Sequence, residues 1–323
     1  MRILIHRDEG IGNLLLSIPA INSIRKNLPN AEINVLIESR AYDLAVGHPS
    51  IDHLYKWPEI PKGKFDFGLN FVFSSGTFLS EMRKICKNII SHPKVSFTTK
   101  SEALHNLEIA GQIGGWDGKY YPSSIYLSEK EENYGLKITK ELQRPIIAIH
   151  IGCQTSIPVH RKRFWRMNGW VELLGLFSKK YDPTFILLGG EGEISESKLL
   201  FSLVKDRIRV VDMVGKYRIK EGASILKNSD LLISIDSGIM HLASVVGTRF
   251  VSLWGPTSEI KSQPWCDQRN YAVVRDETLS CRQCYTRNPR LFQQCTNQIC
   301  MKNITSEMIL DSIEKHGFLT GKN

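Results

Sequence analysis

The chain has 323 residues and a formal net charge of +9, from 42 Lys and Arg against 33 Asp and Glu. This length exceeds what a single hydrophobic core usually serves, so we expect two domains of about 150 residues each. The positive charge favours an anionic partner such as a nucleotide, a phosphorylated glycan or an acidic membrane surface. Nucleic acid is not expected as a partner, because no basic block is interleaved with aromatic residues and the sequence has no helix-turn-helix or zinc-finger pattern.

The sequence also bears on where the protein works. No apolar run reaches the roughly 18 to 20 residues that are needed to span a bilayer. Residues 1–10, MRILIHRDEG, have the pattern of a strand followed by charged residues rather than that of a signal peptide. We therefore expect a cytoplasmic protein that contacts the cytoplasmic face of the inner membrane, if at all, only peripherally.

The first half of the chain alternates strand and helix patterns, which predicts a parallel sheet covered by helices. Residues 1–7 have the pattern of a buried strand, 8–13 that of a glycine loop, 14–28 that of an amphipathic helix with Pro19 at a kink or a late helix start, and 31–39 that of a second strand. Further strand patterns are IDHLYKW, FDFGLNFVF and KVSF, and a basic helical pattern, FLSEMRKICKNII, lies between the last two. The loop at 8–13 falls at the edge where such sheets bind ligands, although its GIGN is equally common in a tight turn.

The second half repeats this alternation after a polar, charge-rich stretch at residues 120–144. PIIAIHIGCQ begins a new buried strand, so we place the domain boundary near residue 144, with domains at 1–144 and 145–323. The loop after that strand is basic, and its cations either neutralise phosphates or form a solvated surface: His160, Arg161, Lys162, Arg163 and Arg166.

A glycine loop at residues 189–193, GGEGE, follows the strand pattern TFILL. Its glycines allow the backbone to approach a nucleotide closely, and Glu193 can accept hydrogen bonds from a ribose or a base. A single glycine loop is weak evidence for a nucleotide site by itself.

The most informative stretch is residues 231–257, LLISIDSGIMHLASVVGTRFVSLWGPT. Its pattern is a buried strand, a turn at residues 236–238, a short helix ended by Gly247 and a second buried strand. Ser237 is a suitable N-cap, and Gly238 lets a ligand approach the backbone. The helix amides then offer a diphosphate site at the carboxyl edge of the sheet, with His241 within reach. The alternative is a helix start without a ligand and a packed or exposed histidine.

Four of the seven cysteines cluster near the C-terminus, at Cys281, Cys284, Cys295 and Cys300. In a cytosolic protein such a cluster suggests a metal or a special thiol before disulfides. The loop around these cysteines lacks core-forming residues, so a metal would stabilise it. Reduced thiols packed in the loop are the alternative.

These motifs together resemble glycosyltransferase family nine, the ADP-heptose:lipopolysaccharide heptosyltransferases, and the resemblance runs nearly end to end. It is carried by R-x-x-x-x-G-[DN]-x-L-L-x-x-P at residues 7–19, the basic segment with Trp165 and Trp170, GGEGE, DSGIMHLAS with GPT, and the four-cysteine segment. It implies a GT-B-type α/β fold of two facing Rossmann-like domains. In that fold, 1–144 binds the acceptor, 145–323 binds the nucleotide sugar, and the C-terminal helix SEMILDSIEKHG returns toward the first domain.

The resemblance implies an inverting, metal-independent transfer of a heptose-like sugar from an ADP-sugar to a lipopolysaccharide core or related glycan. The sequence has no D-x-D triplet that would chelate a metal–diphosphate, in agreement with this. Arg163 stands where the family has a lysine, and we expect it to stabilise the charge on the leaving phosphate. Asp236 is expected to orient the loop or the donor sugar rather than to act as a base. The expected donor-binding residues are Gly152, Lys162, Gly189, Gly190, Glu193, Asp236, Ser237, Gly238 and His241, and the expected acceptor-binding residues are Arg7 and Gly12.

Asn13 departs from the family pattern, in which an aspartate after this glycine often acts as general base on the acceptor hydroxyl. Since an amide cannot take a proton, three explanations are open. Asp8 or Glu9 in the same loop supplies the carboxylate, the subfamily uses another acceptor and base, or the protein is slow or inactive.

Two alternative functions follow from the same residues. One is a relative that glycosylates a protein acceptor, and the other is a non-catalytic nucleotide-sugar-binding protein. Some relatives that modify bacterial surface proteins carry iron on a four-cysteine motif, so the cluster is a candidate for structural zinc or iron. Catalysis itself is expected to need no cofactor.

Overall fold

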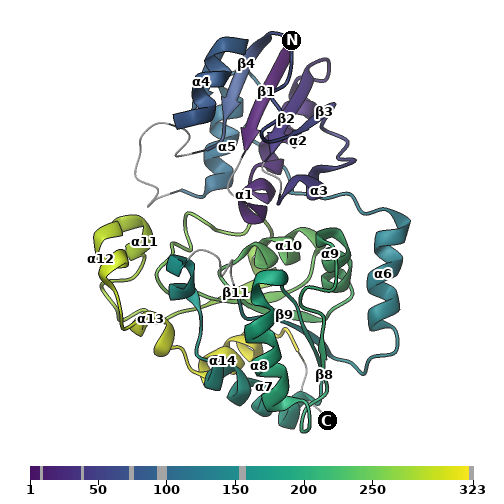
Figure 1. The fold of residues 1–323 in the computed structure, drawn as a ribbon, viewed down its shortest axis with the longest axis vertical. Coiled ribbons are helices and arrows are strands. Elements are labelled where there is room, and N and C mark those ends of the chain that lie inside the picture. Colours follow the sequence, from purple (N-terminus) through teal and green to yellow (C-terminus); the bar gives the residue numbers. More distant parts are fainter. Residues whose placement is uncertain (8–9, 38–39, 73–75, 93–99, 153–157, 320–323) are drawn as a thin grey trace. The chain divides into compact units, whose positions relative to one another are not determined.

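The structure is a computed structural model that describes residues 1–7, 10–37, 40–72, 76–92, 100–152 and 158–319. The chain forms two compact units, one of Met1–Tyr126 with Ile260–Cys266 and one of Leu127–Glu259 with Asp267–Asn323. Each unit contains one parallel sheet with helices packed on it (Figure 1). The α/β architecture predicted from the alternating patterns is confirmed.

The first unit contains a five-stranded sheet in the order β3-β2-β1-β4-β5, and its paired strands are parallel. β1 (Arg2–Arg7) and β2 (Glu32–Ile37) are buried from their second residue onward, as expected for unbroken aliphatic strands that are covered on both faces. The remaining strands are β3 (His53–Lys56), β4 (Phe65–Asn70) and β5 (Cys86–Ser91), and the helices are α1 (Ile11–Leu15), α2 (Ile18–Asn27), α3 (Tyr42–Ala45), α4 (Gly76–Ile85) and α5 (Glu102–Gly111).

The pattern at 14–28 forms two helices, since α1 ends at Leu15 and α2 begins at Ile18. Pro19 lies in the first turn of α2, where its missing N–H costs no helical hydrogen bond. The proline therefore marks a late helix start rather than a kink.

The basic pattern at 78–90 is half helix and half strand. α4 ends at Ile85, and β5 pairs with β4 from Cys86 onward. The strand predicted at KVSF lies outside the described residues.

The second unit contains a six-stranded parallel sheet in the order β11-β10-β9-β6-β7-β8. Its central strands, β9 (Leu231–Ile235) and β6 (Ile146–His150), are buried along their whole length. The other strands are β7 (Thr184–Leu187), β8 (Val210–Asp212), β10 (Phe250–Leu253) and β11 (Tyr271–Val274), and the helices are α6 (Glu129–Thr139), α7 (Met167–Tyr181), α8 (Ile194–Val204), α9 (Ile219–Lys227), α10 (Gly238–Val246), α11 (Cys284–Arg287), α12 (Pro289–Gln294), α13 (Ile299–Lys302) and α14 (Ser306–Lys315). The strand and helix patterns predicted between 145 and 257 are confirmed, whereas β11 has no counterpart in the sequence analysis.

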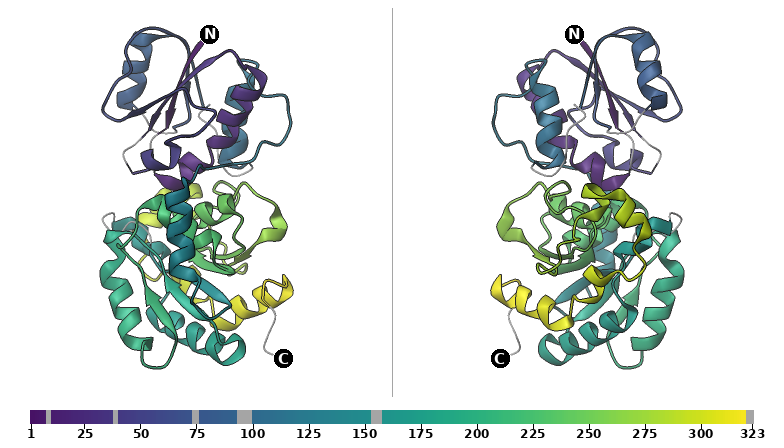
Figure 2. Two further views of the ribbon diagram at one scale, coloured as in Figure 1. Left: turned by 90° about the vertical axis from the view of Figure 1, so that its right-hand side faces the viewer. Right: turned by 90° about the vertical axis from the view of Figure 1, so that its left-hand side faces the viewer.

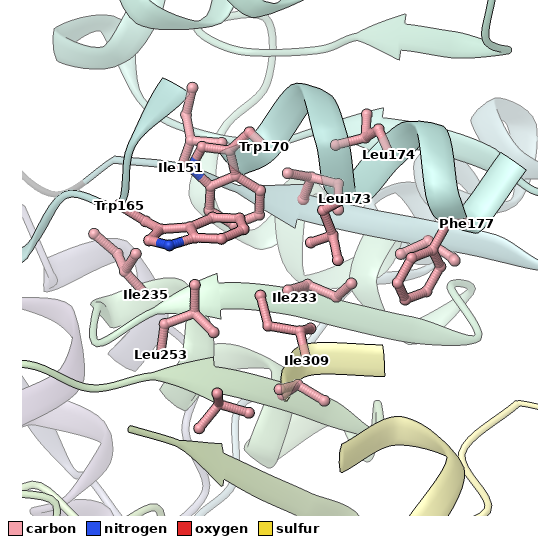
Figure 3. Packing of buried hydrophobic residues seen from close by; sticks show 14 of the residues in the cluster. Ile151, Trp165, Trp170, Leu173, Leu174, Phe177, Ile233, Ile235, Leu253 and Ile309 are labelled. Carbon is pink, nitrogen blue, oxygen red and sulfur yellow. The ribbon is translucent and has the colours of Figure 1, made fainter. Parts of the chain in front are cut away.

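The core of the second unit lies between α7 and the sheet (Figure 3). Trp165 and Trp170 meet edge to face, with ring centroids 5.1 Å apart. Trp165 Nε1 donates a hydrogen bond to the carbonyl of Ile304 at 2.9 Å, which ties the loop before α7 to the segment before α14. Ile309 of α14 packs in the same cluster, so the end of the chain completes this core.

The division of the chain differs from the boundary predicted near residue 144. Residues 127–144 belong to the second unit because α6 packs on α9. Ser224 Oγ donates to the Glu132 carbonyl at 2.8 Å, and the Gly135 amide donates to Ser224 Oγ at 3.2 Å. A Cβ on Gly135 would lie 2.3 Å from the Ser224 backbone, so this approach requires glycine. The polar composition of residues 120–144 is consistent with a helix and an interdomain linker, and the structure confirms the helix, which packs one face on α9.

Residues 260–266 belong to the first unit although they follow β10 in the chain. Trp265 Nε1 donates to the Tyr121 carbonyl at 2.7 Å, and the Trp265 ring stacks on Tyr120 with centroids 5.4 Å apart. The Glu102 amide donates to the Lys261 carbonyl at 2.9 Å, at the start of α5. No pattern in the sequence predicts this return.

The C-terminal helix α14 packs within the second unit. It contacts α7, β10 and β11, and its apolar residues Ile309 and Ile313 are fully buried. In Figure 2 this segment lies on the second unit, in yellow. The apolar face of α14 is therefore part of the core of its own unit, and the return of this helix toward the first domain remains a prediction.

Gly135→Ala is expected to lower the free energy of unfolding by about 1–3 kcal/mol, because the added methyl group overlaps the Ser224 backbone. Gly175→Ala on α7 is the matched control. A Cβ at Gly175 meets no atom within 4 Å, so this change should raise the free energy of unfolding by about 0.5–1 kcal/mol. Urea denaturation measures both changes, and equal effects of the two substitutions would contradict the close packing of α6 on α9.

Candidate functional site

The expected donor-binding residues meet at the carboxyl edge of the second sheet. β6, β7 and β9 are followed in the chain by Gly152, by the glycine loop at 189–193 and by the turn at 236–238. These three strands are consecutive in the sheet and parallel, so the loops that follow them lie at one edge.

α10 starts at this edge, after Ser237, and ends at Gly247, whose φ of 81° lies in the left-handed region that glycine tolerates. Its first turn holds no acidic residue, and no side chain of the described residues caps it. The Ser237 hydroxyl lies instead 3.0 Å from Nδ1 of His150 and 3.1 Å from Oγ of Ser234. The uncapped amides and the positive end of the helix dipole form an arrangement that suits an anion.

Arg163 reaches the same helix start from the end of a 3-10 helix, Pro158–Arg163. Its Nη1 donates to the Asp236 carbonyl at 3.3 Å and lies 3.5 Å from Asp236 Oδ2. The Arg163 side chain is 19% exposed and that of Asp236 6%. Because this ion pair is long, the guanidinium can take up phosphate oxygens without giving up a strong bond.

His241 lies in the first turn of α10 and is buried. Its Nδ1 has no hydrogen-bond partner among the described residues. Burial lowers the pKa of His241 to about 4, although the Asp236 carboxylate opposes the shift. The imidazole is therefore neutral at pH 7, and its buried, unpartnered nitrogen is a costly feature unless a ligand satisfies it.

Glu193 is buried among the glycines that were expected to bind the nucleotide. Its Oε2 accepts a hydrogen bond from the Gly190 amide at 2.5 Å, and burial raises the pKa of the carboxyl group. A Cβ on Gly152 would lie 2.2 Å from Glu193 Cγ, and one on Gly189 would lie 3.0 Å from Oε2. The structure thus brings these four residues together, with Glu193 capping the glycine loop rather than standing free.

Tyr217 belongs to this group and was missed by the sequence analysis. Its hydroxyl accepts a hydrogen bond from the Gly189 amide at 2.7 Å, and burial raises the pKa of the phenol well above its usual range. His150 and Ser234 were missed as well, since each stands in an unbroken strand pattern. No spacing in the sequence distinguishes these three residues from ordinary core or turn positions.

Lys162 is placed elsewhere. Its Nζ donates to the carbonyls of Phe292 and Gln293 at 2.6 and 2.8 Å and lies 5.1 Å from the centroid of the Phe292 ring. The ammonium group therefore holds α12 in the cysteine loop, through carbonyl groups that are not at the sheet edge.

The four cysteines of the loop line one cavity of about 250 Å³, together with Lys162 and Phe292. Cys284 and Cys300 are buried. Burial raises the pKa of Cys300 to about 11, and the neighbouring thiols add to this shift. The donor set suits zinc or iron in kind, since four thiols surround one space. Within the described residues, however, no three such side chains already stand close enough to hold a metal ion.

In the first unit, Arg7 is fully buried at the end of β1. Its guanidinium donates to the Phe71 carbonyl and forms an ion pair with Glu102 of α5. Arg7 thus joins β1, the end of β4 and α5. Its side chain has no solvent-exposed surface that an acceptor could contact. Its assignment to acceptor binding remains a prediction.

Gly12 and Asn13 lie in α1 and are partly exposed. The Asn13 carbonyl accepts a hydrogen bond from the Ser17 hydroxyl at 2.9 Å. Asp8 and Glu9, the expected carboxylates, lie outside the described residues. The roles of these four residues remain predictions.

The buried state of His241 has a consequence for stability. Between about pH 4 and 6.5 the unfolded chain binds a proton on this residue that the folded chain does not, so the free energy of unfolding falls as the pH falls through that window. His241→Gln removes this titrating group. The free energy of unfolding should then depend less steeply on pH, by the contribution of about one proton to the slope. Urea denaturation at pH 4.5, 5.5 and 6.5 measures the slope for both proteins. Equal slopes would mean that His241 is not buried in its neutral form.

Comparisons with known proteins identify the family of this chain. The family model for "Glycosyltransferase family 9 (heptosyltransferase)" matches residues 90–291. "Lipooligosaccharide heptosyltransferase 2" of Campylobacter jejuni subsp. jejuni serotype O:6 is 21% identical over 342 residues, which cover 98% of this chain and 99% of the relative.

Solved structures with low sequence identity share the fold. The glycosyl transferase family 9 protein from Veillonella parvula has a TM-score of 0.76 at 17% identity, and the match covers 98% of this chain and 96% of that one. E. coli ADP-heptose lps heptosyltransferase II has a TM-score of 0.73 at 15% identity, with 98% of both chains covered. The iron-containing dodecameric glycosyltransferase TibC from enterotoxigenic E. coli has a TM-score of 0.66 at 16% identity, covering 98% of this chain and 76% of that one.

Among the described residues, no helix is both long and apolar enough to cross a membrane. The two-sheet α/β fold expected from the resemblance is confirmed by the sheets and by these structural matches. Because the family model spans more than half of the chain, this protein belongs to glycosyltransferase family 9, the heptosyltransferases, and is a glycosyltransferase.

Proposed function

We propose that this glycosyltransferase moves a heptose-like sugar from an ADP-sugar to a lipopolysaccharide core or a related glycan, with inversion and without a catalytic metal. The observation that carries the proposal is the start of α10. The start of α10 has uncapped amides, Nδ1 of His241 without a hydrogen-bond partner among the described residues, and the guanidinium of Arg163 in a long contact with Asp236. The donor and acceptor classes are those named for the similar heptosyltransferases.

The diphosphate is bound by the amides that follow Ser237 and Gly238, with hydrogen bonds from Arg163 and His241. The nucleoside lies at the glycine loop, where Gly152, Gly189 and Gly190 permit close approach of the backbone and Glu193 accepts from the ribose. Asp236 orients Arg163 and the loop. The proposal leaves Lys162 out of the donor site, because its hydrogen bonds are to the cysteine loop.

In the reaction, the acceptor hydroxyl attacks the anomeric carbon of the sugar while the bond from that carbon to the phosphate oxygen breaks. The glycosidic bond forms on the opposite face, which inverts the anomeric configuration, and ADP leaves with the electron pair. Arg163 and the α10 amides stabilise the negative charge that develops on the phosphate. Residues of the second unit thus bind the donor, and residues of the first unit are proposed to bind the acceptor.

The hydroxyl proton must pass to a base, which Asn13 cannot be. We assign this role to Asp8 or Glu9, the two carboxylates in the same loop. A different base in a subfamily with another acceptor is the remaining catalytic alternative.

A protein acceptor is a second candidate, and the four-cysteine cavity favours it. TibC, with which this chain shares its fold, is an iron-containing glycosyltransferase. A mass shift of a candidate acceptor protein in the presence of donor would distinguish this function from glycan transfer. Asn13 alone would suggest a protein that binds a nucleotide sugar without turnover. The transfer assay distinguishes such a binding protein from an enzyme.

We also propose that Cys281, Cys284, Cys295 and Cys300 hold a structural zinc or iron ion. When bound, the metal would cross-link a loop that has few core residues of its own. Its effect on the donor site would be indirect, through the Lys162 contacts to α12. No step of the transfer reaction requires it.

Finally, we propose that the protein works in the cytoplasm, at the surface of the inner membrane. The net charge of +9 supports attraction to anionic headgroups. The basic segment around α4 adds little support, because Lys84 pairs with Glu81 at 2.7 Å and Lys87 with Asp66 at 2.8 Å.

The function is tested by incubating the protein with ADP-heptose and a truncated lipopolysaccharide acceptor and measuring ADP release. Asp8→Asn or Glu9→Gln should lower turnover by roughly 100- to 10,000-fold, while the affinity for ADP stays the same. Full turnover in both variants would refute the assignment of the base. ADP binding without transfer to any acceptor would favour a binding protein, and the absence of ADP binding would refute the donor site.

Freshly purified protein should contain about one zinc or iron ion per chain by elemental analysis. Cys284→Ser should remove the metal and lower the melting temperature, because a thiolate ligand is lost. Cys266→Ser is the control, since Cys266 lies outside the cluster. If the purified protein contains no metal and its melting temperature does not change when zinc or iron is added, the four-cysteine metal site is contradicted.

A further inference from the structure

His150, the last residue of β6, lies beside the N-cap of α10. It is 3% exposed, and its Nδ1 is 3.0 Å from Ser237 Oγ. Ser237 Oγ is 3.1 Å from Ser234 Oγ, and Ser234 Oγ donates to the Ile235 carbonyl at 2.7 Å. His150 Nδ1 also lies 3.3 Å from Ser234 Oγ, so these three side chains, from two neighbouring strand ends, contact one another pairwise.

One arrangement of the protons is compatible with all of these contacts, given that each hydroxyl has only one proton to donate. The Ser234 proton goes to the Ile235 carbonyl, so Ser234 Oγ must accept from Ser237. The Ser237 proton is then used, and the contact with His150 needs a proton on Nδ1. Burial lowers the pKa of His150 to about 3, so the imidazole is neutral and carries its one proton on Nδ1.

This arrangement takes the Ser237 oxygen away from α10. An N-cap serine ordinarily accepts a hydrogen bond from an amide in the first turn. Among the hydroxyl N-caps with extended backbone, Ser101, Ser128 and Thr305 do so at the starts of α5, α6 and α14, whereas Ser237 makes no such bond. The partner that differs is His150, which donates to the Ser237 oxygen.

We propose that His150 is a positioning residue of the donor site: it holds the Ser237 hydroxyl off the α10 amides, so that a diphosphate rather than Ser237 caps the helix. The inference rests on the proposed donor site and assigns it a residue that touches no substrate. The unpartnered Nδ1 of His241 in the same turn is independent support that the helix start is kept open for a ligand.

His150→Leu tests this directly, because it removes the donor and leaves the Ser237 hydroxyl able to rotate onto the Ile239 or Met240 amide. The hydroxyl then competes with the diphosphate, and ADP should bind roughly 2- to 30-fold more weakly by calorimetry. His150→Asn, which keeps an N–H near the Nδ1 position, should restore most of the affinity. His48→Leu is the matched control: His48 is also 3% exposed but lies in the first unit, and its removal should not change ADP affinity.

The double variant His150→Leu with Ser237→Ala separates positioning from simple structural support. Without the competing hydroxyl, the double variant should bind ADP more tightly than His150→Leu alone. If His150 only supports the fold, the double variant should bind ADP as weakly as His150→Leu or more weakly. That result would overturn the proposal. Should His150→Leu fail to fold, His150→Gln replaces it, since its longer side chain carries the amide past the hydroxyl.

Hydrogen exchange gives a readout that does not depend on ADP. The Ile239 and Met240 amides should exchange more slowly in His150→Leu than in the wild type, because the serine now caps them. Unchanged exchange would refute the role of His150 even if ADP binds. If these amides exchange more slowly in His150→Leu but the wild type does not bind ADP, the role of His150 stands and the proposed function is refuted.

Discussion

The donor site of the second unit depends on one electrostatic constraint, the positive end of α10, which has no side-chain cap and lies at the carboxyl edge of the sheet. A helix start without a side-chain cap leaves amide donors unsatisfied, and this is unfavourable unless a ligand supplies acceptors. Here the buried His241 and the long contact between Arg163 and Asp236 are further unsatisfied or weakly satisfied groups at the same place. The site is therefore arranged for an anion before the anion binds. Such preorganised groups lower the activation free energy because they need not reorient when charge develops.

Much of the fold around this site could be predicted from the sequence, because the relevant strands are buried on both faces. LLISI and FVSL are unbroken apolar runs that form β9 and β10, and Gly247 ends α10 in the left-handed conformation that its position suggested. The elements that were missed have no such local signal. β5 and β11 lie at the edges of their sheets. The polar composition of residues 120–144 indicates a helix, but it does not indicate that this helix packs on α9.

The site could be predicted at the level of which loops take part, but not at the level of which atoms are free. The spacing of Gly189, Gly190 and Glu193 identified a loop that could approach a ligand, yet the carboxyl group is used to cap that loop. Lys162 was expected at the phosphates from its charge and position, and it instead bonds two carbonyls of the cysteine loop. Such allocations depend on contacts between residues that are far apart in the chain, and no local pattern encodes them.

The segment at 260–266 has a consequence for the order in which the protein can be assembled. Its Trp265 and Lys261 supply partners to Tyr121 and to the start of α5, so the first unit is not complete within its own N-terminal stretch. During synthesis these partners leave the ribosome only after most of the second sheet has been made. The N-terminal stretch must therefore wait, with Tyr120, Tyr121 and the start of α5 uncovered, and cutting the gene at a single point between the units cannot yield the first unit intact.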